Sequence, residues 1–573
     1  MSKNAAIAEL LEEMANYYDL DEEIWKQRAY AKAARIISGL GQDIEELYEQ
    51  GGTKALIALQ GIGKGIAETL QEYLNTGKIK ELLAMRKKYP GIADMLRVQG
   101  IGPKHAKVLH TTLKIRSLED LKKAAKNHKI RALQGFGEKS EQDILEGITL
   151  LEQTKGRQLL GVALGYAREI KASLQQHPSI QKVQISGSLR RRKETIGDLD
   201  FLITSTHPKE AITYFTSLPE VTRVITKGNS KASVILNIGM NADLRVIDKK
   251  SWGAALQYFT GNKDHNVALR QLAIKKGYKL SEYGLFKGTL RIAGTSEKEI
   301  YAALGLAYIE PELRTHTGEL EHAKNNTLPT LITQNDIKGD LHMHTTWSDG
   351  IASSEEMIRA CMKKRYQYLA ITDHSPSQRL ANGLDKKQLL EHLKELRTLQ
   401  KKYNIQVLFG SEVDILADGQ LDYPDELLAQ LDVVVASVHT RFKMSKTEMT
   451  KRICTALQNK YVTILGHPTG RLLKERKGYD VDFDKVFDCA KKQGVAIEIN
   501  AQPQRMDITD SLIRRAIAQG VMLCITTDAH STEQLNTMEL GVGLARRGWA
   551  EKKNILNTKT WKSLEKYIKR RRQ

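Results

Sequence analysis

Cysteine is scarce in this sequence, and long hydrophobic runs are absent. The 573 residues include four cysteines, Cys361, Cys454, Cys489 and Cys524, and none of them belongs to a C-x-x-C pair. This spacing indicates neither a zinc knuckle nor a disulfide framework, and it fits a reducing compartment. No run approaches the roughly 18 apolar residues of a membrane span, and the acidic, amphipathic N-terminus differs from a signal peptide. We expect a soluble intracellular protein.

Acidic residues are outnumbered by basic ones. Lys and Arg number 88 against 68 Asp and Glu, which gives a formal charge of +20. A polyanionic partner, nucleic acid first, is therefore expected, although solvated lysine faces also make a chain basic. A membrane surface is the weaker interpretation, because no long basic amphipathic helix stands out. The length predicts roughly three to five domains.

The hydrophobic pattern changes along the chain. Residues 1–150 show helical spacing throughout, and residues 151–315 mix helices with strand-like stretches such as VQISGSL and GDLDFLI. Residues 316–336 lack a clear period and are predicted to form a linker. From 337 to 573, strand-like and helical segments alternate, which predicts parallel strands in a closed or nearly closed barrel.

One short glycine pattern occurs three times in the helical region, as LQGIGKGIAETL, VQGIGPKHAKVL and LQGFGEKSEQDIL. Its glycines permit a tight turn and close approach to a phosphate, which meets N–H groups at the start of the next helix. A single G-x-G also ends ordinary helices, whereas three copies in a basic chain favour DNA binding without base readout. The candidate DNA contacts are Gly61, Gly63, Lys64, Gly100, Gly102, Lys104, Gly135, Gly137 and Lys139.

Three carboxylates stand in predicted strands of the central region. Asp198 and Asp200 share one face of a strand, and Asp243 lies in the strand-like NADLRVI. Acidic residues are depleted in strands, so a functional reason is expected. Divalent ions held by three carboxylates can bind a triphosphate and activate a hydroxyl, with the upstream G-S-L-R-R turn holding phosphate oxygens. Exposed aspartates on an edge strand are the plainer alternative for any one of them.

Seven strand-like stretches of the last region each end at a residue type that binds metals. They are KGDLHMH, YLAITDH, VLFGSE, LDVVVASVH, YVTILGH, VAIEIN and VMLCITTDAH. Chemistry sits at the C-terminal ends of the strands in parallel barrels. Imidazole and carboxylate together suit Zn(II), Mn(II) or Fe(II), and nine candidates exceed one tetrahedral site. The candidates are His342, His344, Asp349, His374, Glu412, His439, His467, Asp528 and His530.

The motifs DLHMHTTWSDG, ITDHS, GSEVDI, SVHT, GHPTG and TDAH resemble those of the PHP (polymerase and histidinol phosphatase) family across 337–573. The resemblance implies a distorted (β/α)7 barrel with two or three Mn(II) or Zn(II) ions. It implies one ion at His342, His344, Glu412 and Asp528, a second at Glu412, His439 and His467, and a third at Asp349, His374 and His530. Asp373 is expected to support these ligands, and Cys524 to be a buried strand residue.

Two segments of the central region resemble the nucleotidyltransferase core of family X DNA polymerases. They are GSLRRRKETIGDLDFLI and, further along the chain, SWGAALQYFTGNKDHNVALRQLAIKKGYKLSEYGLF. The resemblance implies that Asp198, Asp200 and Asp243 are catalytic and bind two Mg(II) or Mn(II) ions. It places Gly187, Ser188, Arg191 and Gly197 at the triphosphate and Tyr258, Phe259 and Gly261 at the sugar. Asn266 would face the base and Arg270 the template. Lyase-competent relatives carry a Schiff-base lysine where this chain has Thr69, so 5′-deoxyribose-phosphate lyase activity by this route is expected to be weak or absent. Lys64 and Lys32 are the alternative lysines for such a reaction.

Nearly the entire chain resembles bacterial-type PolX polymerases that carry a C-terminal PHP domain. The expected fold class is multidomain α/β, with a helix-hairpin-helix N-terminal region, a nucleotidyltransferase palm and thumb with a mixed sheet, and a C-terminal barrel. The predicted parts are a lyase-like helical domain (1–80), fingers (81–150), palm (151–235), end of palm and thumb (236–315), linker (316–336) and PHP barrel (337–573).

The resemblance implies a cytoplasmic repair polymerase that fills short gaps in primed double-stranded DNA from dNTPs. It also implies a metal-dependent 3′–5′ exonuclease, possible incision at abasic sites, no membrane partner and a monomer. One alternative is a DNA-binding platform with one degenerate catalytic site, against which the complete carboxylate and histidine sets argue. Another is a small-molecule nucleotidyltransferase fused to a phosphatase, which needs neither three hairpins nor a large positive charge.

Overall fold

A computed structural model describes residues 3–39, 44–59, 61–98, 100–154 and 156–572. The chain divides into two compact units. The first comprises residues 1–155 with the short segments 472–477 and 530–534, and the second comprises the remaining residues. Within the described ranges, no helix combines the length and the apolar character that crossing a bilayer requires.

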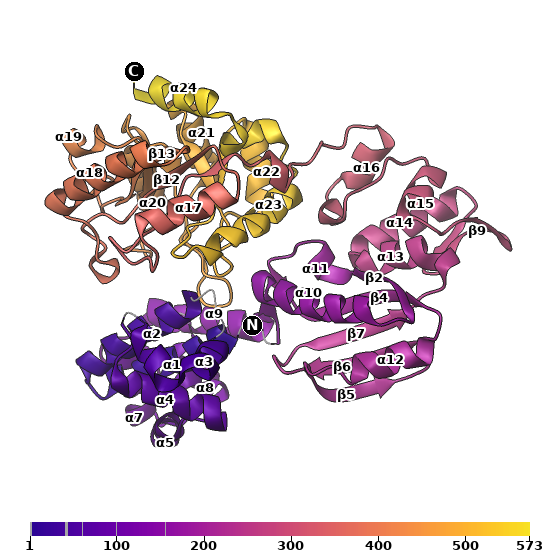
Figure 1. The fold of residues 1–573 in the computed structure, drawn as a ribbon, viewed down its shortest axis with the longest axis horizontal. Helices are drawn as coiled ribbons and strands as arrows, with labels where there is room; N and C mark the ends of the chain where they lie inside the picture. Colours follow the sequence, from indigo (N-terminus) through magenta and orange to yellow (C-terminus); the bar gives the residue numbers. More distant parts are fainter. Residues whose placement is uncertain (1–2, 40–43, 60, 99, 155, 573) are drawn as a thin grey trace. The chain divides into compact units, whose positions relative to one another are not determined.

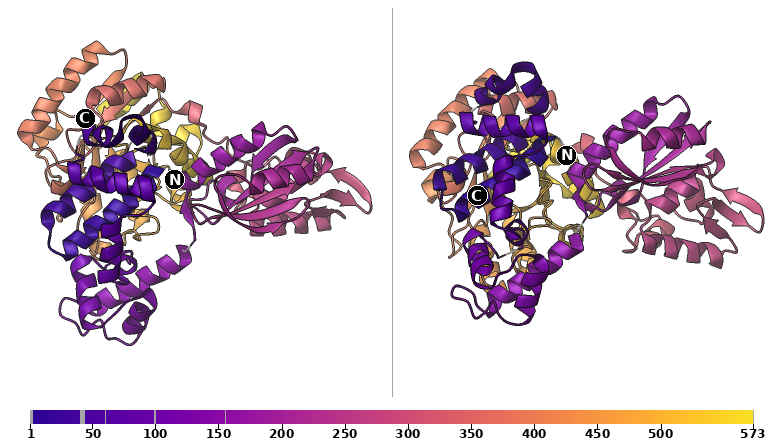
Figure 2. Two further views of the ribbon diagram at one scale, coloured as in Figure 1. Left: turned by 60° about the horizontal axis from the view of Figure 1, so that its bottom comes forward. Right: turned by 90° about the horizontal axis from the view of Figure 1, so that it is seen from below.

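The first unit is helical, as its sequence predicts. Its helices, drawn in indigo and violet in Figures 1 and 2, enclose a core that includes Leu11, Met14, Ile37 and Leu70. They are α1 (Lys3–Leu20), α2 (Ile24–Gly39), α3 (Ile44–Ala58), α4 (Lys64–Thr76), α5 (Lys80–Lys88), α6 (Ile92–Leu96), α7 (Pro103–Thr112), α8 (Leu118–Lys126) and α9 (Glu138–Thr154).

The second unit begins with a five-stranded mixed sheet in the order β2-β4-β7-β6-β5. The stretch VQISGSL, expected to be one strand, ends its strand at Ile185, and Gly187–Arg190 form a helical turn instead. The elements are β1 (Gln158–Leu159), α10 (Leu160–Gln176), β2 (Ile180–Ile185), α11 (Gly187–Arg190), β3 (Thr195–Ile196), β4 (Asp198–Ser205), α12 (Pro208–Thr216), β5 (Val221–Lys227), β6 (Lys231–Leu236) and β7 (Asn241–Val246).

Helices and a small antiparallel sheet of order β10-β9-β8 follow. Their shared core includes Leu269, Leu285, Ile300 and Tyr301. The elements are η1 (Lys249–Ser251), α13 (Trp252–Thr260), α14 (Lys263–Lys275), β8 (Lys279–Ser281), β9 (Gly284–Lys287), β10 (Leu290–Ala293), α15 (Glu297–Ala303) and η2 (Pro311–Leu313).

Residues 316–336, expected to be a linker, are folded. They contain α16 (Glu319–Lys324) and η3 (Gln334–Asp336). Glu319 is fully buried with one carboxylate oxygen 2.6 Å from His265 Nδ1, and Ala323 and Leu331 join the core of the preceding helices. The segment shows no period because it is held by the hydrogen bond between Glu319 and His265 and by a few scattered apolar residues, rather than by an apolar stripe.

The last region is a seven-stranded parallel sheet whose strands follow sequence order from β11 to β17. A parallel bridge between Met343 and Ala529 joins the two edges, and His344 N–H donates to Ala529 O at 2.8 Å. The strands are β11 (Gly339–Asp340), β12 (Tyr368–Ile371), β13 (Gln406–Asp414), β14 (Val433–Ser437), β15 (Ile464–Leu465), β16 (Ala496–Asn500) and β17 (Leu523–Thr526). The expected barrel is confirmed.

Helices cover this barrel, and several start at capping boxes that satisfy N–H groups of the first turn, as at Ser353 and Ser445. They are α17 (Ser354–Lys363), η4 (Arg379–Ala381), α18 (Lys386–Lys402), α19 (Asp425–Leu428), α20 (Lys446–Leu457), α21 (Phe483–Gln493), α22 (Asp510–Gln519), η5 (Glu533–Thr537), α23 (Met538–Arg547), η6 (Lys552–Asn554), η7 (Leu556–Thr558) and α24 (Trp561–Arg572). Strands such as β14 are buried on both faces, which explains their unbroken apolar sequence.

Candidate active sites

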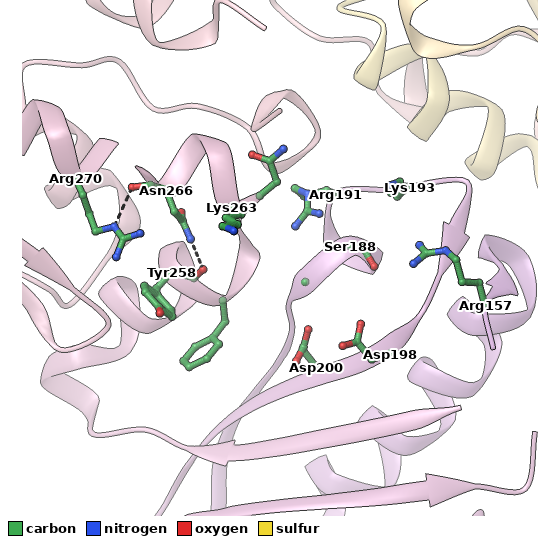
Figure 3. A pocket seen from close by; sticks show the side chains of 14 residues that line it. Arg157, Ser188, Arg191, Lys193, Asp198, Asp200, Tyr258, Lys263, Asn266 and Arg270 are labelled. Carbon is green, nitrogen blue, oxygen red and sulfur yellow. Dashed lines mark hydrogen bonds between the residues drawn. The ribbon is translucent and has the colours of Figure 1, made fainter. Parts of the chain in front are cut away.

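Three carboxylates meet on neighbouring strands of the five-stranded sheet. Asp198 and Asp200 lie two residues apart on β4, and Asp243 of the parallel strand β7 is opposite Asp200. Figure 3 shows Asp198 and Asp200 side by side, near Ser188. Burial, followed by the charges of Asp198 and Asp243, raises the pKa of Asp200 to about 7. Such crowded negative charge suits divalent cations, whose preferred ligands are carboxylate oxygens.

A pocket of about 450 Å³ opens beside these carboxylates (Figure 3). The predicted nucleotide contacts that line it are Gly187, Ser188, Arg191, Tyr258, Phe259, Gly261, Asn266 and Arg270. Gly197 and Asp243 are not among its lining residues. Arg157, Lys193, Asn262 and Lys263 line it as well and were not predicted from the sequence. Three of these four are cationic, which suits a polyphosphate.

The turn into α11 needs a glycine. Gly187 has φ +63°, and a Cβ at this position would lie 2.3 Å from Asp200 Oδ2. At the other end of α11, Arg191 Nη1 donates to the carbonyl of Thr260 at the end of α13. Burial lowers the pKa of Arg191 to about 10, so its guanidinium is still charged at neutral pH. The turn therefore brings a permanent positive charge against the carboxylates.

A buried ion network fixes the neighbouring arginine. Arg190 makes two hydrogen bonds to the Glu297 carboxylate, at 2.8 and 2.6 Å, and a third to Thr260 Oγ1 at 2.6 Å. Arg314 binds the same carboxylate from its other side. Burial would raise the pKa of Glu297, but Arg314 and Arg190 lower it to about 2. The network ties α11 to α13 and α15, and thereby holds the two walls of the pocket together.

The wall expected to face sugar and base is also braced from within. Asn266 Nδ2 donates to the Tyr258 carbonyl at 2.7 Å, and Asn266 Oδ1 accepts from Gln257 Nε2 at 2.7 Å. The Arg245 guanidinium lies 4.6 Å from the centre of the Phe259 ring. Asn266 of α14 is thus held in one orientation by two residues of α13.

All the predicted barrel ligands converge at the C-terminal ends of the strands. The ligands form three groups, and within each group the ligand atoms all lie within 4.8 Å of one another. The groups are His344, Asp349, His374 and His530; His342, His344 and Asp528; and His374, Glu412 and His439. His467 joins through Nε2, which lies 2.9 Å from Glu412 Oε1. Glu412 lies between several of these histidines. Burial by itself would raise its pKa, but the nearby His439, His342 and His374 lower the pKa well below the ordinary value.

The donor set suits metal ions. His342 Nε2 and His344 Nε2 lie 3.1 Å apart, and the latter is 3.1 Å from Asp528 Oδ1. Such spacings correspond to ligand atoms around one ion with metal–nitrogen bonds of about 2.0–2.1 Å. His467 Nδ1 is buried without a hydrogen-bond partner among the described residues. The arrangement can hold ions that polarise a phosphodiester and a water molecule.

A second layer of buried acids orients these ligands, and the sequence pointed only to Asp373 among them. Glu498 of β16 binds His342 Nδ1 at 2.6 Å and Thr526 Oγ1 at 2.6 Å. Asp414 Oδ1 lies 3.2 Å from His439 Nδ1. Asp373 holds the loop after His344 by accepting from Thr345 N–H at 2.8 Å. Glu498 could have been found from the sequence, because it is an acidic residue inside the apolar strand VAIEIN and acidic residues are rare in strands.

The described residues of the three glycine patterns share one glycine conformation and one hydrogen bond. Gly61, Gly100 and Gly135 have φ of +98°, +91° and +86°. In each turn the N–H after this glycine donates to the carbonyl two residues before it, at 3.0–3.1 Å. Helices α4, α7 and α9 each begin three residues after this glycine, so the turn leads directly into a helix start whose first N–H groups lack partners within the helix. The third copy, which diverges most in sequence, is thereby equivalent to the first two.

Comparison with known proteins assigns the parts of the chain. Family models match as a helix-hairpin-helix domain at 2–79, a SAM-like helix-hairpin-helix tandem at 92–149, a DNA polymerase beta thumb at 255–315 and a PHP domain at 340–502. A probable phosphatase of Thermoanaerobacter sp. (strain X514) is 31% identical over 41% of this chain and 95% of its own. The DNA polymerase/3′–5′ exonuclease PolX of Bacillus subtilis (strain 168) is 41% identical over 98% of this chain and 99% of its own. Given this similarity along the whole length, the chain belongs to the PolX family.

Proposed function

We propose that this chain is a DNA-repair polymerase that also degrades DNA from its 3′ end, with the two reactions at separate sites. The observation that carries the proposal is the presence, in one chain, of a carboxylate triad beside a cationic pocket and of a histidine-rich cluster in a barrel. The full-length similarity to a polymerase/exonuclease supports it. Primed or gapped double-stranded DNA and dNTPs are the proposed substrates, and the chain is proposed to act as a monomer.

For the polymerase reaction, Ser188 and Arg191 bind the triphosphate of the incoming nucleotide. Asp198, Asp200 and Asp243 hold two Mg(II) or Mn(II) ions, which would lower the pKa of the primer hydroxyl and neutralise the phosphates. The backbone of Tyr258 and Phe259 lines the sugar position and disfavours a ribose 2′-hydroxyl. Asn266 is positioned at the base, and Arg270 at the template.

For the nuclease reaction, the histidines and acids at the barrel mouth hold two or three Mn(II) or Zn(II) ions. Such ions, when bound, would supply a hydroxide near neutral pH and stabilise the charge that develops on the phosphodiester. Glu412 links the groups, and Glu498 fixes the His342 ring so that Nε2 points into the cluster. We extend the proposal to incision at abasic sites, which breaks the same type of bond.

Base-excision gap filling is the proposed process, and lyase chemistry at the position of Thr69 is proposed to be weak or absent. Thr69 Oγ1 donates to Gly65 O at 3.0 Å and lies 3.0 Å from the Tyr30 hydroxyl. A hydroxyl in this place cannot form the imine that β-elimination requires. The barrel nuclease and the polymerase site would then process the ends of a gap without a Schiff base at Thr69.

Two double variants on one primed template test the assignment of activities. Asp198→Ala with Asp200→Ala removes two cation ligands, so extension is expected to fall by about a thousandfold or more. Degradation of the primer is expected to continue. His342→Ala with His344→Ala is expected to abolish degradation and to leave extension intact. Product lengths on a denaturing gel, with and without dNTPs, measure both reactions.

Circular dichroism and thermal melting of both variants control for folding. Loss of both activities in either folded variant would contradict the two-site assignment. Extension that survives in the aspartate variant would instead remove the triad from the reaction.

A further inference from the structure

The phosphate-binding turn of the polymerase site, residues 187–195, is held by the barrel. This turn consists of α11 and the loop that leads from α11 to the start of β3. It carries Gly187, Ser188 and Arg191 of the pocket. Side chains of α23, and of the loop that follows β15, reach this turn from within the same compact unit. These contacts are separate from the bonds that tie α11 to α13 and α15.

Arg547, at the end of α23, makes the most direct contact. Its Nη1 donates to the carbonyl oxygen of Arg191 at 2.9 Å, and its Nη2 donates to Asp510 Oδ2 at 2.5 Å. The Arg547 side chain is 9% exposed. A buried guanidinium that is anchored to a carboxylate on one side gives a rigid support on its other side. Arg547 also adds positive charge beside the Arg191 guanidinium, which is one reason that the pKa of Arg191 is lowered.

A second arginine of the barrel holds the far end of the turn. Arg471 Nη2 donates to Glu194 Oε1 at 2.7 Å, and the Arg471 side chain is 12% exposed. Arg471 is itself fixed by the carbonyls of Arg505, at 3.0 Å from Nε, and of Met506. The turn is therefore anchored to the barrel on both sides of Lys193, one of the cations that line the pocket.

The body of α23 packs beside the same turn. Glu539 accepts two hydrogen bonds from Arg168 of α10, at 2.7 and 2.6 Å, and lies 3.9 Å from Arg192. Gly543 leaves room for Arg192, since a Cβ at Gly543 would lie 3.1 Å from the Arg192 Cγ. On α23, Gly543 therefore provides space for the Arg192 side chain, and Glu539 provides a negative charge near its guanidinium.

We propose that the barrel supplies positioning residues to the polymerase reaction: Arg547 and Arg471 hold the 187–195 turn in the conformation that binds the triphosphate. The proposal rests on the polymerase function proposed above. Binding of a triphosphate places several negative charges on this turn, and a turn that is already held loses little entropy on binding. The barrel therefore serves two reactions, one through its histidine cluster and one through α23.

Arg547→Ala and Glu194→Gln test this support from the two sides of the interface. Each removes a charge-assisted hydrogen bond, so the KM for dNTP is expected to rise about tenfold, with a smaller change in kcat, because the support acts in the ground state and the transition state alike. Arg547→Lys keeps a cation and is expected to restore part of the loss. Exonuclease kcat/KM on single-stranded DNA is expected to stay within about twofold of wild type.

Arg515→Ala is the matched control, because Arg515 pairs with Asp484 at 2.6 Å and both residues lie in the barrel. It is expected to leave the KM for dNTP unchanged. Glu194 lies outside the barrel, so the Glu194→Gln variant still tests the proposal if Arg547→Ala folds poorly. An unchanged KM in both variants overturns the proposal, as does an equal loss of polymerase and exonuclease activity. Failure of the wild type to extend a primer would instead refute the polymerase function itself.

Discussion

The carboxylate triad and the histidine cluster, the two proposed ion sites of this chain, are built from different chemistry at different depths. The polymerase cluster is made of carboxylates at the edge of an open pocket, and Asp198 in it is exposed. The barrel cluster is made mainly of imidazoles, with Glu412 and His344 fully buried and Glu498 behind them. The first is supported by arginines, and the second by acids.

This difference implies different modes of ion binding. A few carboxylates on an open surface bind Mg(II) weakly until a nucleotide triphosphate adds further oxygen ligands. Imidazoles that are oriented by buried acids bind softer ions such as Mn(II) or Zn(II) and retain them. We therefore expect resident ions in the barrel and ions that arrive with the nucleotide at the polymerase pocket.

The largest effect expected from this contrast comes from removing metals. Chelation followed by gel filtration is expected to abolish both activities. Added Mg(II) alone is expected to restore extension fully, whereas Mn(II) is expected to restore degradation better than Mg(II) does. Metal analysis of untreated protein by mass spectrometry is expected to find ions that are lost in the His342→Ala/His344→Ala variant. Degradation that is at least as fast with Mg(II) alone would contradict the contrast.

A smaller effect is expected from the acid behind the histidines. Glu498→Ala leaves His342 Nδ1 without its acceptor, so metal affinity and exonuclease rate are expected to fall about 10- to 100-fold. Glu498→Gln keeps an acceptor oxygen and is expected to fall less. Metal content after dialysis provides a measurement that is independent of activity, and primer extension provides the control. A variant that retains full metal content would remove Glu498 from this role.

The smallest effect sharpens the comparison from the polymerase side. Because the pKa of Asp200 is raised to about 7, this carboxyl takes up a proton as the pH falls through neutrality. Protons then compete with Mg(II) for this carboxylate. The affinity for Mg(II) is expected to be highest at pH 8, and below pH 7 it is expected to decrease by up to about tenfold for each pH unit. Isothermal titration with Mg(II) and a non-hydrolysable dNTP between pH 6 and 8 measures this. An affinity independent of pH would show that Asp200 is already ionised.

The sequence was sufficient for the barrel because its signal is repeated. Alternating strands and helices predict parallel strands, and a metal-binding residue type at each strand end places the ligands on one face. The five-stranded sheet was harder, since Gly187–Arg190 continue an apparent strand but form α11. Its helical turn depends on the positive φ of Gly187 and on Asp200, 13 positions later in the chain.

The missed residues share a physical reason. Arg157, Lys193 and Lys263 look like ordinary surface cations until the fold brings them to the pocket. Glu319 looks like part of a polar linker, because its partner His265 lies 54 positions away. Contacts at such separations leave no period in the sequence, so they appear only in the folded chain.

The barrel is closed by a bridge between Met343 and Ala529, which joins its first strand to its last. His342 and His344 come from the beginning of this region and Asp528 and His530 from near its end, so the histidine cluster can assemble only once the chain has been synthesised through His530. A chain that stops before Asp528 carries Asp198, Asp200 and Asp243 but lacks Asp528 and His530 of the barrel cluster.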